Sequence, residues 1–225
     1  MSKLTALVLG CATAMATVTG GVAYGDMLVN DFGDGLQSWR FDFGSPITPN
    51  LSRDASEGSP GNAPGALRMD MTFVSSQGGG NRFAFTGDLF FPATDLSGFD
   101  TLEFDLKIAD GAALDAFGNH GFFQFVSRET DSYNFNSVLN QNLAPVTGQW
   151  QTYTVPAAEV DGMTATRAFT VQLYGGPDQN IDGGITLLLD NIRLTGDPIP
   201  EPSAFVITIA AGLLAATRRG QSKRG

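Results

Sequence analysis

The sequence predicts an all-β fold, a single antiparallel β-sandwich of the jelly-roll type. Apolar and polar residues alternate with a period of two in several segments, which is typical of strands with one buried and one solvated face. Clusters of Gly, Pro, Asn and Asp separate these segments at regular intervals. No stretch has the apolar spacing of an amphipathic helix. Many short strands joined by such turns favour a sandwich or jelly roll.

The alternation is clearest in three segments, residues 67–73, 101–108 and 169–174. In each, Leu, Met, Phe, Ile or Val residues occupy every second position, and mostly polar residues occupy the positions between them. Trp39 and Trp150 are expected to pack in the core or at its rim rather than to bind a ligand. The further expected strands cover residues 39–44, 81–91, 121–128, 133–139, 150–155 and 184–195.

The N-terminus has the pattern of a secretory signal peptide. Lys3 is followed by an apolar region over residues 4–18, and residues 21–23 and 23–25 both satisfy the small-x-small cleavage rule. We therefore expect residues 1–25 to direct export from the cytoplasm. The sandwich domain should then cover residues 26–196.

The C-terminus carries a second apolar segment, residues 203–217, with basic residues only at its far end. At about 15 residues it is shorter than the roughly 17 that usually span a bilayer, so a packed helix competes on length alone. The segment lacks a polar stripe, and its one-sided basic end is typical of a cytoplasmic stop signal. Both features favour a short transmembrane helix.

The order Pro-Glu-Pro, short apolar helix and Arg-rich end resembles the PEP-CTERM sorting signal of Gram-negative bacteria. The resemblance implies processing by exosortase, a membrane-embedded cysteine protease or transpeptidase, and an association with extracellular polysaccharide and biofilm. It assigns residues 197–225 as the sorting signal, with transient membrane contact through its helix. It also implies a location in the cell envelope, on the outer surface or in the extracellular matrix. The residues that carry the motif are Pro200, Glu201, Pro202, Arg218 and Arg219.

Charge and cysteine content exclude several functions. All 23 Asp and Glu residues lie between Asp26 and Glu201, whereas five of the 13 Lys and Arg residues lie at the two ends of the chain. Such an acidic body is repelled by phosphate backbones, so we expect no nucleic-acid partner. The one cysteine, Cys11, falls in the expected signal peptide. The mature chain therefore has neither a disulfide nor a thiol nucleophile.

Catalytic residues are hard to place. His120 is the only histidine, and no Gly-x-Ser-x-Gly motif accompanies it. Glu103 and Asp105 resemble the start of the Glu-x-Asp-x-x-Glu signature of laminarinase-like sandwich hydrolases, but Ile108 stands where the second Glu should be, and both acids also fit a solvated strand face. Because glycosidases need two placed carboxylates, we expect no enzyme activity. A divergent glycan-active hydrolase or lyase is the alternative.

Three stretches of the body, taken in order, carry a second resemblance. "NDFGDGLQSWRF" opens the domain, "GQWQTYTVP" comes late and "LLLDNIRLTG" closes it. They resemble β-sandwich carbohydrate-binding modules and their galactose-binding-like relatives. The resemblance implies a non-catalytic protein that binds envelope or biofilm polysaccharide. A structural matrix protein without a specific ligand is the other interpretation.

The candidate ligand residues lie opposite in phase to the apolar ones. In such modules sugars stack on exposed aromatic rings, and amide or guanidinium groups fix their hydroxyls. Gln172 and Tyr174 share the outward face of one strand, and we expect both to be exposed. Gln124 and Arg128 share a face of another strand, and Tyr133 falls in the loop after it. Each could equally be an ordinary surface side chain.

A structural Ca²⁺ ion is the only cofactor that we expect. Asp31 or Asp34 would meet Asp190 if the first and last strands pair. The resemblance implies a calcium ion at that place, held by carboxylate and carbonyl oxygens. Asp-Gly and Asp-Asn pairs also form turns and bulges, so this alternative stays open.

Overall fold

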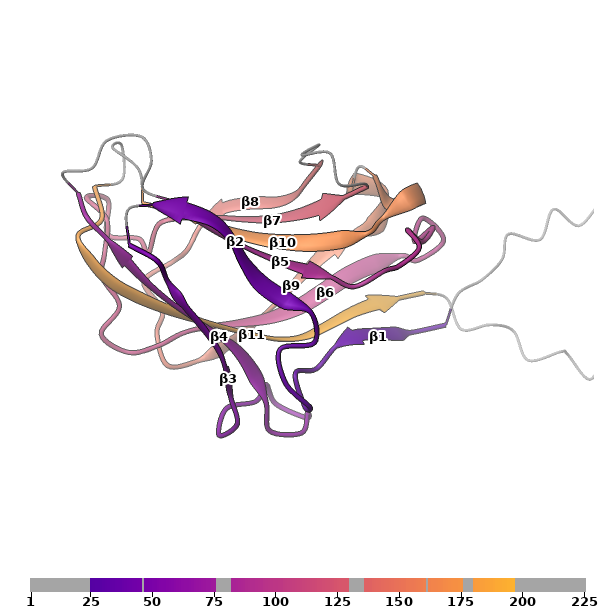
Figure 1. Ribbon diagram of the computed structural model, residues 1–225, viewed down its shortest axis with the longest axis horizontal. Coiled ribbons are helices and arrows are strands. Elements are labelled where there is room, and N and C mark those ends of the chain that lie inside the picture. Colours follow the sequence, from indigo (N-terminus) through magenta and orange to yellow (C-terminus); the bar gives the residue numbers. More distant parts are fainter. Residues whose placement is uncertain are drawn as a thin grey trace, which may run out of the picture.

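A computed structural model describes residues 25–45, 47–75, 82–129, 136–160, 162–175 and 180–196. In this part of the chain two antiparallel sheets pack face to face, as Figure 1 shows. The predicted all-β sandwich is therefore confirmed. Residues 1–24 of the expected signal peptide, the whole expected sorting signal and Tyr133 lie outside the described residues. None of the helices found within those ranges is long and apolar enough to cross a membrane.

The first sheet, sheet A, has six strands. Its order is β3 (Asn50–Asp54), β4 (Ala66–Phe73), β11 (Gly183–Thr195), β6 (Thr101–Ile108) and β9 (Trp150–Pro156), and β1 (Met27–Asn30) also pairs with β11. The second, sheet B, has the order β2 (Trp39–Ser45), β5 (Arg82–Asp88), β10 (Ala168–Tyr174), β7 (Phe122–Arg128) and β8 (Asn136–Asn142). Two short 3-10 helices, η1 (Ala157–Glu159) and η2 (Met163–Ala165), lie between β9 and β10.

The predicted strands correspond to nine of these elements, and two strands were missed. β1 is only four residues long, and β3 is a short and mostly polar strand at the edge of sheet A, so neither has a clear alternation. The strand expected at 81–91 ends at Asp88, because the next two amides donate to the carbonyl of Arg167 instead of a sheet partner. The strand expected at 133–139 is observed at Asn136–Asn142.

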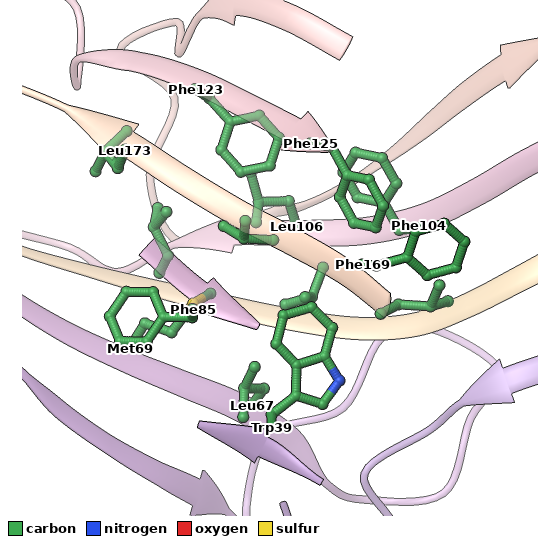
Figure 2. Packing of buried hydrophobic residues seen from close by; sticks show 14 of the residues in the cluster. Trp39, Leu67, Met69, Phe85, Phe104, Leu106, Phe123, Phe125, Phe169 and Leu173 are labelled. Atoms are coloured by element: carbon green, nitrogen blue, oxygen red, sulfur yellow. The ribbon is translucent and has the colours of Figure 1, made fainter. Parts of the chain in front are cut away.

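Aromatic side chains join the two sheets. Phe104 of β6 stacks on Phe125 of β7 at 4.5 Å between ring centroids, and on Tyr153 of β9 at 5.4 Å. Phe123 and Phe169 extend this cluster from β7 and β10 (Figure 2). Burial of each such ring stabilises the fold by about 1.5–3 kcal/mol. The core is therefore built from the predicted inward positions.

The two tryptophans have the predicted structural places. Trp39 lies in the core, 3 % exposed, with its ring edge-on to Phe32. Trp150 is half-buried at the start of β9, where the Lys107 ammonium lies 6.0 Å from its ring. Neither ring is on the outer face of sheet B.

The loop between β3 and β4 covers part of the outer face of sheet A. Glu57 of this loop forms an ion pair with Lys107 of β6 at 2.8 Å, and the Ser59 amide donates to Asp190 of β11 at 2.7 Å. Beneath the loop Leu188 is buried, although its cross-strand partners Arg68 and Lys107 face outward. The outer face of sheet B is therefore the better place to look for a ligand.

Candidate functional site

Cross-strand pairing places Arg82, Tyr174 and Phe122 in one row across the outer face of sheet B, and the ring of Phe43 reaches this row from one outward position further along. Tyr174 of β10 is the direct partner of Arg82 on β5 and of Phe122 on β7. Phe43 of β2 pairs with Ala84, the next outward position of β5, and its ring lies under Arg82. We call Phe43, Arg82, Tyr174 and Phe122 the aromatic row.

The guanidinium group of Arg82 lies between two rings of the aromatic row. Its Cζ atom is 4.9 Å from the centroid of Phe43 and 5.7 Å from that of Tyr174. The rings of Tyr174 and Phe122 meet edge-on at 6.2 Å. Arg82 is exposed, and the three rings are half-buried. The row thus offers apolar ring surface and charged N–H donors to a ligand.

An amide row runs alongside Arg82, Tyr174 and Phe122, one outward position further along the strands and in register with the backbone of Phe43. Gln172 of β10 pairs directly with Gln124 of β7, which pairs with Asn140 of β8. The Tyr174 hydroxyl donates to Gln172 Oε1 at 2.8 Å, and Gln124 Nε2 donates to Asn140 Oδ1 at 2.6 Å. The structure therefore brings together the predicted residues Gln124, Gln172 and Tyr174.

The expectation that Gln172 and Tyr174 are both exposed was wrong. Gln172 has the predicted outward parity, because Val171 and Leu173 on either side of it point into the core. Yet Gln172 is buried, only 2 % exposed, whereas Tyr174 is half-buried. The Tyr174 hydroxyl bonds to the Gln172 side chain, which lies between Ala84 and Gln124 on the neighbouring strands. Gln172 therefore positions Tyr174.

Arg128 also has the predicted outward parity but lies at the other end of β7 from Phe122. Its Nη2 atom forms an ion pair with Asp42 of β2 at 2.5 Å. Thr86 Oγ1 donates to the same carboxylate at 3.2 Å, and the Thr86 and Thr170 hydroxyls lie 2.8 Å apart. This buried network links β7, β10, β5 and β2 across the sheet.

The Arg128–Asp42 pair bridges two intervening strands of this face. Two strands, β10 and β5, separate β7 from β2, and neighbouring strands lie about 4.8 Å apart. Their long side chains meet above Thr86 and Thr170. Thr86 and Thr170, which face outward on the two central strands, are fully buried there. The candidate site is thus the outer face of sheet B, with the aromatic row at one end of its strands and Arg128 at the other end of β7.

The acidic residues proposed for calcium are only partly brought together. β1 and β11 do pair, as expected. Asp31 accepts hydrogen bonds from the Gly33 amide and the Gln37 side chain, and the Gly33 bond is the main cause that lowers its pKa. Asp34 is exposed. Among the described residues, no three His, Cys, Asp or Glu side chains form a group that could hold a metal ion. The calcium site remains a prediction.

Asp190 is the strongest of these candidates. It is fully buried at a bulge in β11, and burial raises the pKa of its carboxyl group. Its oxygens accept hydrogen bonds from the amides of Ser59 and Asn191, both at 2.7 Å. The Asp-Asn pair thus forms a bulge, which was one of the two alternatives. A buried carboxylate held by neutral donors is still suited to a cation.

Arg53 is a structural residue that the sequence did not reveal. Its guanidinium group donates to the carbonyl oxygens of Phe32 and Gly33, both at 2.6 Å, and to that of Pro64 at 3.0 Å. Two of these carbonyls belong to the residues that directly follow Asp31. A built-in positive charge therefore joins the loop after β1 to the loop before β4.

The residues that resembled a hydrolase signature have structural partners on sheet A. Glu103 forms an ion pair with Arg193 at 2.5 Å. Asp105 accepts hydrogen bonds from Thr152 and Asn191, and it is buried rather than solvated as expected. His120 is buried in the loop before β7, with Nδ1 2.8 Å from the carbonyl oxygen of Ala113. None of these residues belongs to the outer face of sheet B.

Comparisons with known proteins give the fold. No protein-family model matches the chain, and no curated protein matches its sequence. Among solved structures it is similar to a carbohydrate-binding module specific for non-crystalline cellulose, with a TM-score of 0.53 and 16 % identity over 76 % of this chain and 95 % of that one. It is also similar to part of an exo-β-agarase, with a TM-score of 0.51 and 13 % identity over 76 % of this chain and 25 % of that one. At such identities the likeness shows the β-sandwich fold alone.

Proposed function

We propose that this chain binds polysaccharide, without catalysis, on the outer face of sheet B. The observation that carries the proposal is the aromatic row with the amide row beside it. Sugar rings stack their C–H faces on aromatic side chains, and amide groups bond to the hydroxyls at the ring edges. The two rows supply both kinds of contact at neighbouring outward positions of the same strands.

The length of the aromatic row favours a polymer over a single sugar. The row crosses β2, β5, β10 and β7, which are neighbours in that order. Three strand spacings amount to about 14 Å, which is longer than one sugar ring. A chain of linked sugars that crosses the strands would contact Phe43, Tyr174 and Phe122 in turn.

The site is also largely formed before any ligand binds. Gln172 holds the Tyr174 hydroxyl, Asn140 holds the Gln124 amide, and Arg82 is fixed between two rings. Side chains that are already ordered lose less conformational entropy on binding. Affinity can therefore come from a modest number of contacts.

The proposal extends to where the protein acts. The PEP-CTERM-like tail supports export, processing by exosortase and a place in the envelope or matrix of a Gram-negative bacterium. The described domain begins and ends at one place, because β1 pairs with the end of β11 and the Gly196 amide donates to Asp26 at 3.4 Å. Removal of both terminal segments would therefore leave the sheets intact.

Affinity gel electrophoresis tests the binding function. The purified domain is run through gels that contain soluble β-glucans, mannans, xylans or acidic polysaccharides. We expect at least one polymer to retard the wild-type domain and Tyr174→Ala to weaken that retardation. Phe91→Ala is a matched control, because Phe91 is an aromatic residue 88 % exposed but outside the aromatic row. If no polymer retards the domain, the interpretation as a structural matrix protein is favoured, and reducing-sugar release would instead reveal an enzyme.

A further inference from the structure

Arg82 differs from the other cations on the sheets. The other Arg and Lys side chains on the strands of the described chain bind carboxylates or, in one case, backbone carbonyls. These contacts are Arg40–Asp88, Arg53 with three carbonyls, Arg68 with Asp54 and Asp70, Lys107–Glu57, Arg128–Asp42 and Arg193–Glu103. Within the same described ranges, no Asp or Glu forms an ion pair with Arg82.

This difference is unexpected in so acidic a chain. The formal net charge is −10, so an exposed cation has many carboxylates available as partners. Arg82 instead contacts Phe43 and Tyr174, with a hydrogen bond of 3.5 Å from Nη1 to the Tyr174 hydroxyl. Rings beside a guanidinium group restrict its orientation and displace water, but they do not neutralise its charge. The cation is thus held in place with its charge uncompensated by a carboxylate of the described chain.

The position of Arg82 places this charge in the middle of the proposed binding surface. It lies on β5, with Phe43 on one side and Tyr174 on the other. A polymer that stacks on these two rings must pass over the guanidinium group. A neutral sugar gains only ordinary hydrogen bonds there, whereas an anionic group gains charge-assisted ones in a planar fork.

We propose that the aromatic row binds an anionic polysaccharide, and that Arg82 binds the acidic group, a carboxylate or a sulfate ester, of a sugar that spans Phe43 and Tyr174. This inference rests on the proposed function. The acidic surface of the domain repels a polyanion at long range, but this repulsion decays over about 8 Å at physiological ionic strength. The selectivity for charge therefore depends on the local contact with Arg82.

Polymers that share a backbone but differ in charge give the test. Three pairs are polygalacturonate against its methyl ester, carboxymethylcellulose against hydroxyethylcellulose, and dextran sulfate against dextran. Affinity gel electrophoresis should show stronger retardation by an anionic polymer than by its neutral partner. The carboxylated pairs and the sulfated pair tell which acidic group is bound. Above about 0.15 M NaCl, where the long-range repulsion is largely screened, further salt up to about 0.5 M should weaken binding of the anionic polymer and leave binding of a neutral one unchanged.

Variants assign the effect to one residue. Arg82→Gln should lower the affinity for the anionic polymer by about tenfold or more, because hydrogen bonds to charged groups are the strong ones. Arg82→Lys, which keeps the charge but not the planar fork, should recover part of the loss. Arg40→Gln is the matched control, because Arg40 is also an exposed arginine of sheet B but is paired with Asp88, outside the aromatic row. It should bind like the wild type.

The outcomes separate this inference from the proposed function. Equal retardation by charged and neutral polymers, with no salt effect and no change in Arg82→Gln, would overturn the role of Arg82. Polysaccharide binding would still stand if Tyr174→Ala then weakened it. A domain that no polymer retards would overturn both. The salt titration uses the wild-type protein, so it remains decisive even if Arg82→Gln unfolds.

Discussion

Two adjacent residues of β10, Leu173 and Tyr174, allow folding and binding to be separated. Leu173 is fully buried, and its cross-strand partners Phe83 and Phe123 are fully buried as well. Leu173→Ala would leave a cavity among these rings. We expect it to lower the free energy of unfolding by about 2–5 kcal/mol, the range for such truncations. Affinity should be unchanged in the fraction that stays folded.

Tyr174→Ala should instead lower affinity strongly and the free energy of unfolding only slightly. It removes an edge-on contact with Phe122, worth about 0.5–1.5 kcal/mol, and the hydrogen bond to Gln172. We expect a loss of about 1–2 kcal/mol in the free energy of unfolding, because Tyr174 is only half-buried. Loss of an anchoring aromatic contact should weaken polysaccharide binding by about 1–3 kcal/mol, a factor of roughly 5 to 150. Tyr174→Phe keeps the ring and should keep most of the affinity.

Urea denaturation and affinity gel electrophoresis on the three variants measure both effects. A Leu173→Ala variant as stable as the wild type would show that the inward parity of β10 is wrong. A Tyr174→Ala variant that is folded and binds normally would remove the aromatic row from the site. Comparable losses of affinity in both alanine variants would mean that binding only reports folding.

Two further predictions concern processing and metal. Mature protein from the native host should lack the residues beyond about Pro202, and Glu201→Ala should leave unprocessed protein in the inner membrane; mass spectrometry that finds an intact terminus at Gly225 would contradict exosortase sorting. If Asp190 holds Ca²⁺, chelation should lower Tm, because an ion bound only to the folded state stabilises it, and Asp190→Ala should melt low and ignore calcium. The raised pKa of Asp190 gives this prediction a pH dependence. Without a metal, the protonated carboxyl group of Asp190 stabilises the folded state fully below the unfolded pKa near 3.8, and this stabilisation is lost as pH rises through the higher folded pKa. Calcium binds the ionised carboxylate, so it should raise Tm most above that pH window. A wild-type Tm that does not respond to chelator at neutral pH would end the calcium hypothesis.

The strands that the sequence predicted well are those whose alternation is imposed by the core. In β4, β6 and β10 one apolar face packs between the sheets, so the period of two is preserved along each strand. β3 has no such constraint, because it is a short edge strand with mostly half-buried residues. Its pairing with β4 is a property of the assembled sheet, which local sequence does not report.

Alternation with core residues also decided which site residues the sequence could predict. Gln124, Gln172 and Tyr174 were identified because each alternates with buried neighbours. Phe122 was missed, although it shares parity with Gln124 and the same reasoning would have found it. Phe43 could not be found in this way. By simple alternation it would face inward like Phe41, but a bulge in β2 between these two residues reverses its direction.

The role of Arg82 could not be predicted from the residues next to it in the sequence. It lies at the start of β5, after a Gly-rich stretch, and its local pattern gives no sign of a neighbour. Its importance comes from pairing with Tyr174, which is 92 residues away in the chain, and from the turn of Phe43 toward the outer face. A cation is significant here because of what surrounds it in three dimensions.

The bulge in β2 also defines a last prediction, which concerns Arg128. It places Asp42 within reach of Arg128, so the same irregularity that turns Phe43 outward lets Asp42 act as a brace, an ion pair that holds β2 to β7 across the outer face of sheet B. If Arg128 acts as a brace rather than as a ligand residue, Asp42→Ala should lower the free energy of unfolding by about 3–5 kcal/mol, the range for removing one partner of a buried ion pair.

The double variant Asp42→Leu with Arg128→Met then distinguishes the two roles of Arg128. It replaces the pair with apolar side chains of similar size, so stability should return toward that of the wild type. If Arg128 is a brace, polysaccharide affinity should return as well, because the aromatic row lies at the other end of β7. A double variant that is stable but has lost its affinity would instead make Arg128 part of the binding surface, as its outward parity first suggested.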